Sequence, residues 1–113
     1  MELKTSIEEL KQSLLESEAF VRYQKVRAKV HNYPEKEYRL HEFRRKNYFL
    51  QNSREQLDLF TEEDRLEQEY ADVCKDPLLG EYLAAEVAVC RIIQQVNKEL
   101  IGCLDFEAIL YEE

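Results

Sequence analysis

The chain has 113 residues, of which two are Gly and two are Pro, while 35% are charged and the formal net charge is −8. All-β folds need turns rich in Gly and Pro, and Gly80 and Gly102 alone cannot build a glycine-rich phosphate-binding loop. These counts exclude β-sandwiches, β-barrels and the common nucleotide-binding folds. The acidic charge also disfavours attraction of the whole molecule to DNA or RNA, because phosphate binding depends on Lys and Arg.

The expected compartment follows from the cysteines and from the first residues. Cys74, Cys90 and Cys103 are odd in number and form no C-x-x-C motif, as expected for reduced thiols in the cytoplasm. The first twenty residues contain five glutamates and no apolar run, so we expect no signal peptide. No stretch of 18 apolar residues is present, which predicts no transmembrane helix and no membrane partner.

The first half of the chain is expected to form two long helices. Thr5 and Glu8 have the spacing of a capping box before a helix over about 6–32, and Ser17 is a second N-cap candidate that would break it in two. Pro34 favours the first position of the next helix, expected over 34–57.

Two further helices are expected over 61–75 and 77–104, within a single domain spanning 1–113. The last helix carries an apolar stripe covering about half its circumference, wider than a surface helix needs. This width indicates contact with several neighbours or with a second subunit. The candidate interface residues are Tyr82, Val89, Ile93, Val96 and Leu100. We therefore predict an all-α fold: an elongated antiparallel hairpin or bundle, partly of coiled-coil type, that forms homodimers or higher oligomers.

Charges are distributed unevenly between two neighbouring segments. Residues 35–54 are rich in Lys and Arg, whereas residues 55–76 are rich in Asp and Glu. Antiparallel packing of these segments would bring opposite charges together. Arg44, Arg45 and Lys46, followed by two aromatic residues, are candidates for RNA contact, because basic residues bind phosphates and aromatic rings stack on bases. The alternative is that the basic residues face the acidic segment and the aromatic residues face the core.

No arrangement of residues indicates catalysis. His31 and His41 lack the spacing of metal ligands, and an iron–sulfur cluster usually needs four thiolates, so three scattered cysteines would need several chains to hold one. Cys90 is expected to pack in the core or at an interface, as free cysteines often do. We expect no enzyme activity, no metal and no cofactor. A multi-chain iron–sulfur or metal-binding redox sensor is a further alternative.

Several short motifs occur in a specific order along the chain. They are Ser17-Glu18-Ala19-Phe20, then Leu40-His41-Glu42-Phe43-Arg44, then the run from Asp76-Pro77-Leu78 to Glu86, and last Ile92, Ile93, Val96, Asn97, Leu100 and Ile101. In this order, over residues 6–104, the sequence resembles the YlbF/YmcA family of small bacterial helical proteins.

The resemblance implies a self-associating helical protein without catalytic residues. Relatives regulate competence, sporulation and biofilm formation as subunits of a complex that adjusts the mRNA-cleaving RNase Y. The expected partners are therefore a second copy, family paralogues or RNase Y. Iron–sulfur clusters of that complex are linked to a cysteine-rich C-terminal tail, which this sequence does not have. The working hypothesis is a cytoplasmic, non-enzymatic regulatory or scaffold protein.

Overall fold

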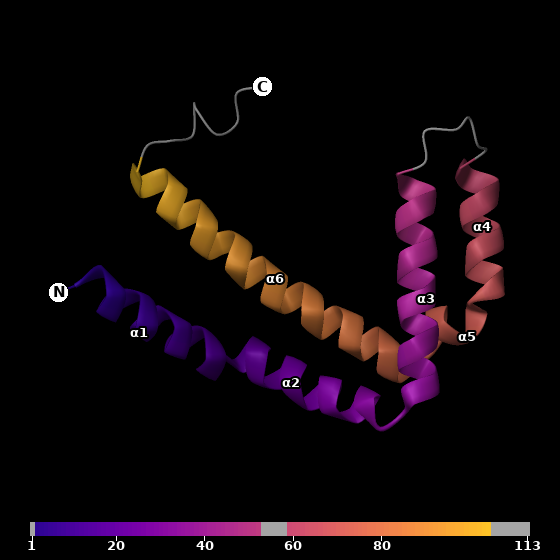
Figure 1. Cartoon of the computed structure of the whole chain (residues 1–113), viewed down its shortest axis with the longest axis horizontal. Helices are drawn as coiled ribbons and strands as arrows, with labels where there is room; N and C mark the ends of the chain where they lie inside the picture. The colour runs from indigo at the N-terminus through magenta and orange to yellow at the C-terminus, as the bar shows by residue number, and fades with distance from the viewer. Residues whose placement is uncertain (1, 53–58, 105–113) are drawn as a thin grey trace. The chain divides into compact units, whose positions relative to one another are not determined.

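The computed structural model describes residues 2–52 and 59–104 (Figure 1). Within these ranges the chain forms helices and no strand, so the all-α prediction is confirmed. The helices are α1 (Leu3–Glu16), α2 (Glu18–His31), α3 (Pro34–Gln51), α4 (Leu59–Glu69), α5 (Ala71–Cys74) and α6 (Pro77–Leu104).

The contacts divide the chain into two compact units. The first unit combines Met1–Tyr23 with Ala84–Glu113, and the second unit is Gln24–Leu83. The division falls within α2 and within α6. That the chain behaves as one domain stays a prediction.

The start of α6 shows why Asp76-Pro77 begins a helix. The Asp76 Oδ1 atom accepts hydrogen bonds from the backbone N–H groups of Leu78 at 2.9 Å and Leu79 at 3.1 Å. These N–H groups have no partner within the helix, so the carboxylate stabilises the first turn. Pro34 likewise occupies the first turn of α3, where its missing N–H is not needed.

Ser17 ends α1 and begins α2. Its backbone is extended, with ψ of 147°. Its hydroxyl donates a hydrogen bond to the Leu14 carbonyl at 2.7 Å and accepts one from the Phe20 N–H at 3.3 Å. One side chain therefore satisfies orphan groups on both helices, and the chain breaks at this position.

Two other expected helix starts are wrong. The helix expected from residue 6 begins at Leu3, before Thr5, and the helix expected from residue 61 begins at Leu59, before Thr61. Neither threonine has a Pro beside it, as Asp76 has, and neither has the extended backbone of Ser17. A β-branched residue fits inside a helix with only a small loss of propensity, so both helices begin before the expected residues.

The segment expected as one helix over 61–75 is divided at Tyr70, which has φ of −110° and ψ of 35° between α4 and α5. The Tyr70 carbonyl accepts hydrogen bonds from the N–H groups of Val73 and Cys74. The helix expected over 34–57 is described only to Gln51, where α3 ends. Residues 53–58 lie outside the described residues.

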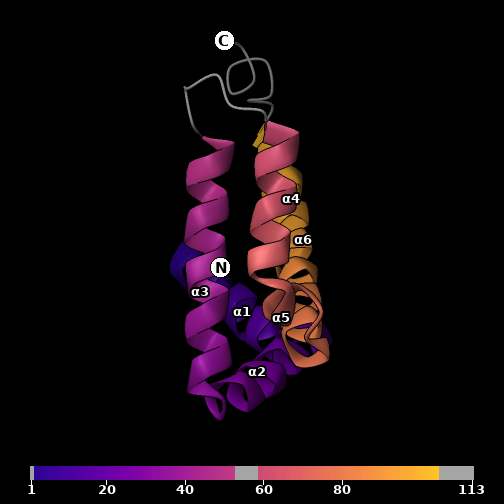
Figure 2. The ribbon, with the colours of Figure 1, turned by 90° about the vertical axis from the view of Figure 1, so that its right-hand side faces the viewer.

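The second unit is built around an antiparallel hairpin of α3 and α4, which lie side by side in both views (Figures 1 and 2). Tyr70 lies at the centre of its core and is 1% exposed. Its ring centroid lies 5.7 Å from that of Phe43. The buried cluster consists of Val26, Val30, Leu40, Leu66, Tyr70, Val73 and Leu79.

Candidate protein-binding surfaces

An apolar groove of about 260 Å³ lies in the first unit, between α1 and α6. Lys11 and Ser17 are the polar residues that line it. The apolar lining residues are Leu14, Leu15, Phe20, Val89, Ile92 and Ile93. Because six of the eight lining residues are apolar, the groove suits an apolar side chain of another protein.

The α1 side of the groove follows from the spacing of its apolar residues. Leu3, Ile7, Leu10 and Leu14 are separated by four, three and four residues, which places them along one face. None of the residues of α1 is buried, and Leu3 and Ile7 are 77% and 47% exposed. The spacing was visible in the sequence, but the sequence alone did not identify this face as unburied.

Four of the five predicted interface residues lie in the first unit. Val89 and Ile93 line the groove. Val96 and Leu100 continue the same stripe toward the end of α6, and Leu100 is 50% exposed. Tyr82 belongs to the second unit, where it packs partly buried against the core cluster. Tyr82 therefore belongs to a different unit from the other four candidates, and the role of all five as an interface stays a prediction.

The predicted pairing of the basic and acidic segments is confirmed in the second unit. Lys36 forms an ion pair with Asp76 at 2.6 Å, and Lys46 forms one with Glu69 at 3.1 Å. The hydrogen bond from Lys36 holds the pKa of Asp76 below its ordinary value. Hydrogen bonds with Tyr70 and Glu69 raise the pKa of Lys46.

The three candidate RNA-binding residues differ in their contacts and exposure. Lys46 is paired with Glu69, and the Arg44 guanidinium carbon lies 5.9 Å from the centroid of the Tyr82 ring. Arg45 is exposed. The structure thus bears out the expected packing of Lys46 against the acidic segment, while RNA contact through these residues stays a prediction.

The aromatic residues after Lys46 do not face the core. Tyr48 and Phe49 are each 66% exposed, and their rings meet edge-on with centroids 6.1 Å apart. The expectation that they turn inward is wrong, because Leu40, Phe43 and Leu50 already fill the inner face of α3.

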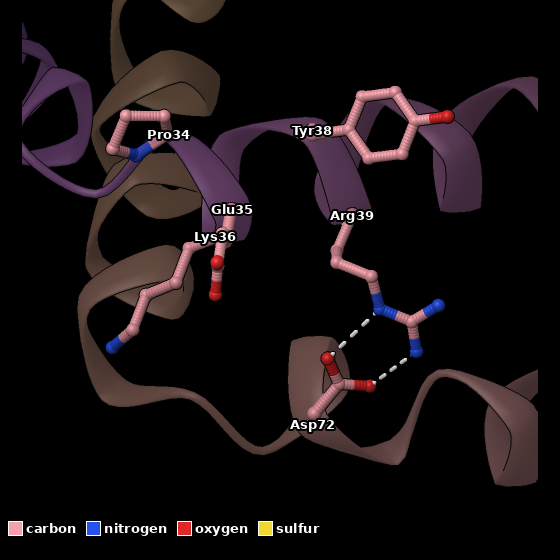
Figure 3. Close-up of a pocket in the computed structure, with 6 residues that line it drawn as sticks. All are labelled: Pro34, Glu35, Lys36, Tyr38, Arg39 and Asp72. Atoms are coloured by element: carbon pink, nitrogen blue, oxygen red, sulfur yellow. Dashed lines mark hydrogen bonds and ion pairs between the residues drawn. The ribbon is translucent and has the colours of Figure 1, made fainter.

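A broad hollow of about 580 Å³ lies beside the start of α3, and Figure 3 shows its lining. The Arg39 guanidinium points to Asp72 and donates to both carboxylate oxygens, at 2.7 and 3.1 Å. Lys36 is paired with Asp76. With these charges in ion pairs, a ligand in the hollow would contact Pro34, the ring of Tyr38 and the exposed side chain of Glu35.

The cysteines are exposed in the described part of the chain. The expected packing of Cys90 in the core is therefore wrong, while its packing at an interface stays a prediction. Partial burial of the Cys74 thiol, together with the nearby carboxylates of Glu67 and Asp72, raises its pKa. Within residues 2–52 and 59–104, no three His, Cys, Asp or Glu side chains gather as metal ligands would.

The two histidines have different surroundings. His31 Nδ1 lies 2.6 Å from a carboxylate oxygen of Glu37, and His41 is exposed on α3. A search of the described helices for membrane spans finds none with sufficient length and apolar character.

Comparison with known proteins identifies the family of the chain. The profile described as "Control of competence regulator ComK, YlbF/YmcA" matches residues 3–104. The chain is also 27% identical over 105 residues to a "UPF0342 protein" of Caldicellulosiruptor bescii, covering 91% of this chain and 88% of that protein. No solved structure matches it significantly. The matched segment contains every helix described above, and the chain belongs to the YlbF/YmcA family.

Proposed function

We propose that the chain is a non-enzymatic regulatory or scaffold protein that acts through protein–protein contacts. The observation that carries the proposal is the apolar groove between α1 and α6 in the first unit. Its volume of about 260 Å³ accommodates one or two large apolar side chains of a partner. An amphipathic helix that lays its apolar face into such a groove is a common mode of recognition.

The extent of uncovered apolar surface supports the proposal. Ile93 is 47% exposed and Leu15 is 53% exposed, although both are large aliphatic residues that folding normally buries. Contiguous apolar patches of this kind mark binding sites in soluble proteins. A second copy is the first partner we propose, because its own α1 and α6 carry the matching apolar stripes.

Family membership supports a more specific role. We propose that the protein controls competence, sporulation or biofilm formation, and that it does so in the cytoplasm as a subunit of a complex with family paralogues or RNase Y. In the proposed complex the chain provides a binding surface and no catalytic group. It needs neither a cofactor nor a nucleic-acid contact of its own.

The interface is tested with the variant Ile93→Asp. A carboxylate in the apolar groove must lose its hydration when a partner covers it, so light scattering should show a smaller species than the wild type. Gln94→Asp is the matched control, because Gln94 is exposed on the same helix and lies outside the groove. An oligomer unchanged by Ile93→Asp, with circular dichroism equal to that of the wild type, contradicts the interface.

The regulatory role is tested in the native bacterium. Deletion of the gene should change competence, sporulation or biofilm formation, and it should change the pattern of RNase Y cleavage products. Wild-type protein and Gln94→Asp should restore the phenotype, whereas Ile93→Asp should not. Full restoration by an Ile93→Asp protein that no longer associates would refute the claim that function depends on this groove.

A further inference from the structure

The outer face of α3 carries a stripe of four residues, of which Tyr38, Arg45 and Phe49 are exposed and Glu42 is half-buried. Tyr38, Glu42, Arg45 and Phe49 are separated by four, three and four residues, so they lie along one side of the helix. Tyr38 and Phe49 are 64% and 66% exposed. The core side of α3 is turned away from them and is marked by Leu40, which is 1% exposed.

The order of these residues is self-complementary. The stripe has an aromatic residue at each end, Tyr38 and Phe49, and two residues of opposite charge between them. This pattern of aromatic and charged positions is the same from either end of the stripe. If a second α3 packs antiparallel about a two-fold axis through the midpoint between residues 43 and 44, Tyr38 faces Phe49 of the other copy. Glu42 then faces Arg45 of the other copy, and the same two contacts repeat on the other side of the axis, as a two-fold interface requires.

We propose that this face of α3 is a second self-association surface, on which another copy of the chain packs as an antiparallel helix pair. The 4-3-4 spacing is that of the a and d positions of a coiled coil, and in antiparallel pairs these positions oppose one another across the seam. A different protein would need no such symmetry in its binding surface, so the palindromic order favours a second copy over a heterologous partner.

The hollow beside Tyr38 provides room for the incoming ring. Its volume is about 580 Å³, and the lining drawn in Figure 3 consists of Pro34, Glu35, Lys36, Tyr38, Arg39 and Asp72. The ammonium group of Lys36 is paired with Asp76 at 2.6 Å, so an entering ring does not have to displace it. In the proposed pair, Phe49 of the second copy reaches the mouth of this hollow.

The residue types also fit an interface. Tyr, Phe and Arg are enriched where proteins meet, and Tyr and Arg often carry much of the binding free energy. This surface belongs to the second unit, whereas the groove of the proposed function belongs to the first. Two separate two-fold surfaces allow assemblies larger than a dimer, which extends the proposed function without depending on it.

The experiment uses charge reversal on the full-length chain carrying Ile93→Asp, which disables the groove. Arg45→Glu places two glutamates opposite one another in both symmetric contacts, and Glu42→Arg does the same with two arginines. In sedimentation equilibrium at low salt, each single variant should associate with itself at least about tenfold more weakly than the parent. Mixing the two variants in equal amounts should restore association, because each acid then faces an arginine.

The mixture distinguishes this surface from damage to the fold, since a misfolded variant is not rescued by another variant. Phe49→Asp should also abolish association, whereas the matched control Phe60→Asp should not, because Phe60 is 84% exposed on α4 and lies outside the stripe. A monomeric parent, or a mixture no stronger than its separate components, overturns the proposal. Either result leaves the groove hypothesis standing, because that test depends on Ile93 alone.

Discussion

Arg39 on α3 and Asp72 on α5 form a bidentate ion pair, with Nη2 to Oδ1 at 2.7 Å and Nε to Oδ2 at 3.1 Å. The same guanidinium donates to the Glu69 carbonyl at 3.2 Å, and its central carbon lies 4.3 Å from the centroid of the Tyr70 ring. One side chain therefore connects α3 to the last residue of α4, to the break at Tyr70 and to α5.

We expect Arg39→Lys to lower the thermal unfolding midpoint although it keeps the charge. Lysine is a point donor and cannot reproduce the planar fork that binds a carboxylate through two parallel hydrogen bonds. Asp72→Asn should lower the midpoint as well, and the double variant should cost less than the two single effects added together. Differential scanning calorimetry measures all four proteins. Strict additivity would show that the pair is not coupled.

Tyr70→Ala should cost about 3–5 kcal/mol in unfolding free energy, as expected for a buried aromatic residue that leaves a cavity. A loss of this size approaches the whole stability of many small domains, so the variant should be largely unfolded or much less cooperative in urea. Phe60→Ala, at the exposed start of α4, should change the free energy by less than about 0.5 kcal/mol. Similar losses for both variants would contradict the central role of Tyr70.

Asp76 should make stability depend on acid pH. Its hydrogen bond with Lys36 and its bonds to backbone N–H groups hold its pKa below the ordinary value. The stabilisation is therefore complete above the unfolded pKa of about 3.9 and is lost as the pH falls through the lower folded value. Asp72 acts in the same direction through Arg39.

The measurement is urea denaturation between pH 7 and pH 2 for the wild type and for Asp76→Asn. The variant keeps an oxygen that caps α6 but has no carboxylate to titrate, so its stability should fall less steeply below about pH 4. At pH 7 it should be less stable than the wild type, because the ion pair with Lys36 is gone. Parallel curves for the two proteins would exclude Asp76 as a source of the acid sensitivity.

Cys74 should react slowly with alkylating reagents, because only the thiolate is nucleophilic and its pKa is raised by partial burial and by Glu67 and Asp72. Glu67→Gln removes one carboxylate, which lowers the pKa and should speed the alkylation of Cys74 at pH 8. Mass spectrometry of a Cys90→Ser, Cys103→Ser background follows this residue alone. A slower reaction in Glu67→Gln would reverse the expected sign.

Features decided by neighbouring residues could be predicted from the sequence. Asp76 and Pro34 start helices because their own chemistry suits a first turn, and Ser17 breaks the chain because its hydroxyl caps both sides. The pairing of the basic and acidic segments followed from charge alone. In each case the partner groups lie within a few residues or on the adjacent helix of a hairpin.

Features decided by tertiary packing could not be predicted. The break at Tyr70 follows from the burial of its ring against Phe43, which no local pattern reveals. Tyr48 and Phe49 point outward because other residues already fill the core side of α3. The α6 side of the groove could be predicted, because the periodicity of apolar residues identified Ile93. The α1 side, with Leu14 and Leu15, could not, because the sequence does not reveal that α1 has no buried residue.

The absence of buried residues in α1 has a consequence for the lifetime of the protein. A helix of 14 residues with no buried residue has little tertiary packing to stabilise it. An uncovered α1 therefore opens more readily than the core around Tyr70 and offers proteases an early cleavage site. A partner seated on α1 raises the free energy of that opening by mass action. Assembly then protects the chain from degradation, and the unassembled excess is the fraction that a cell removes first.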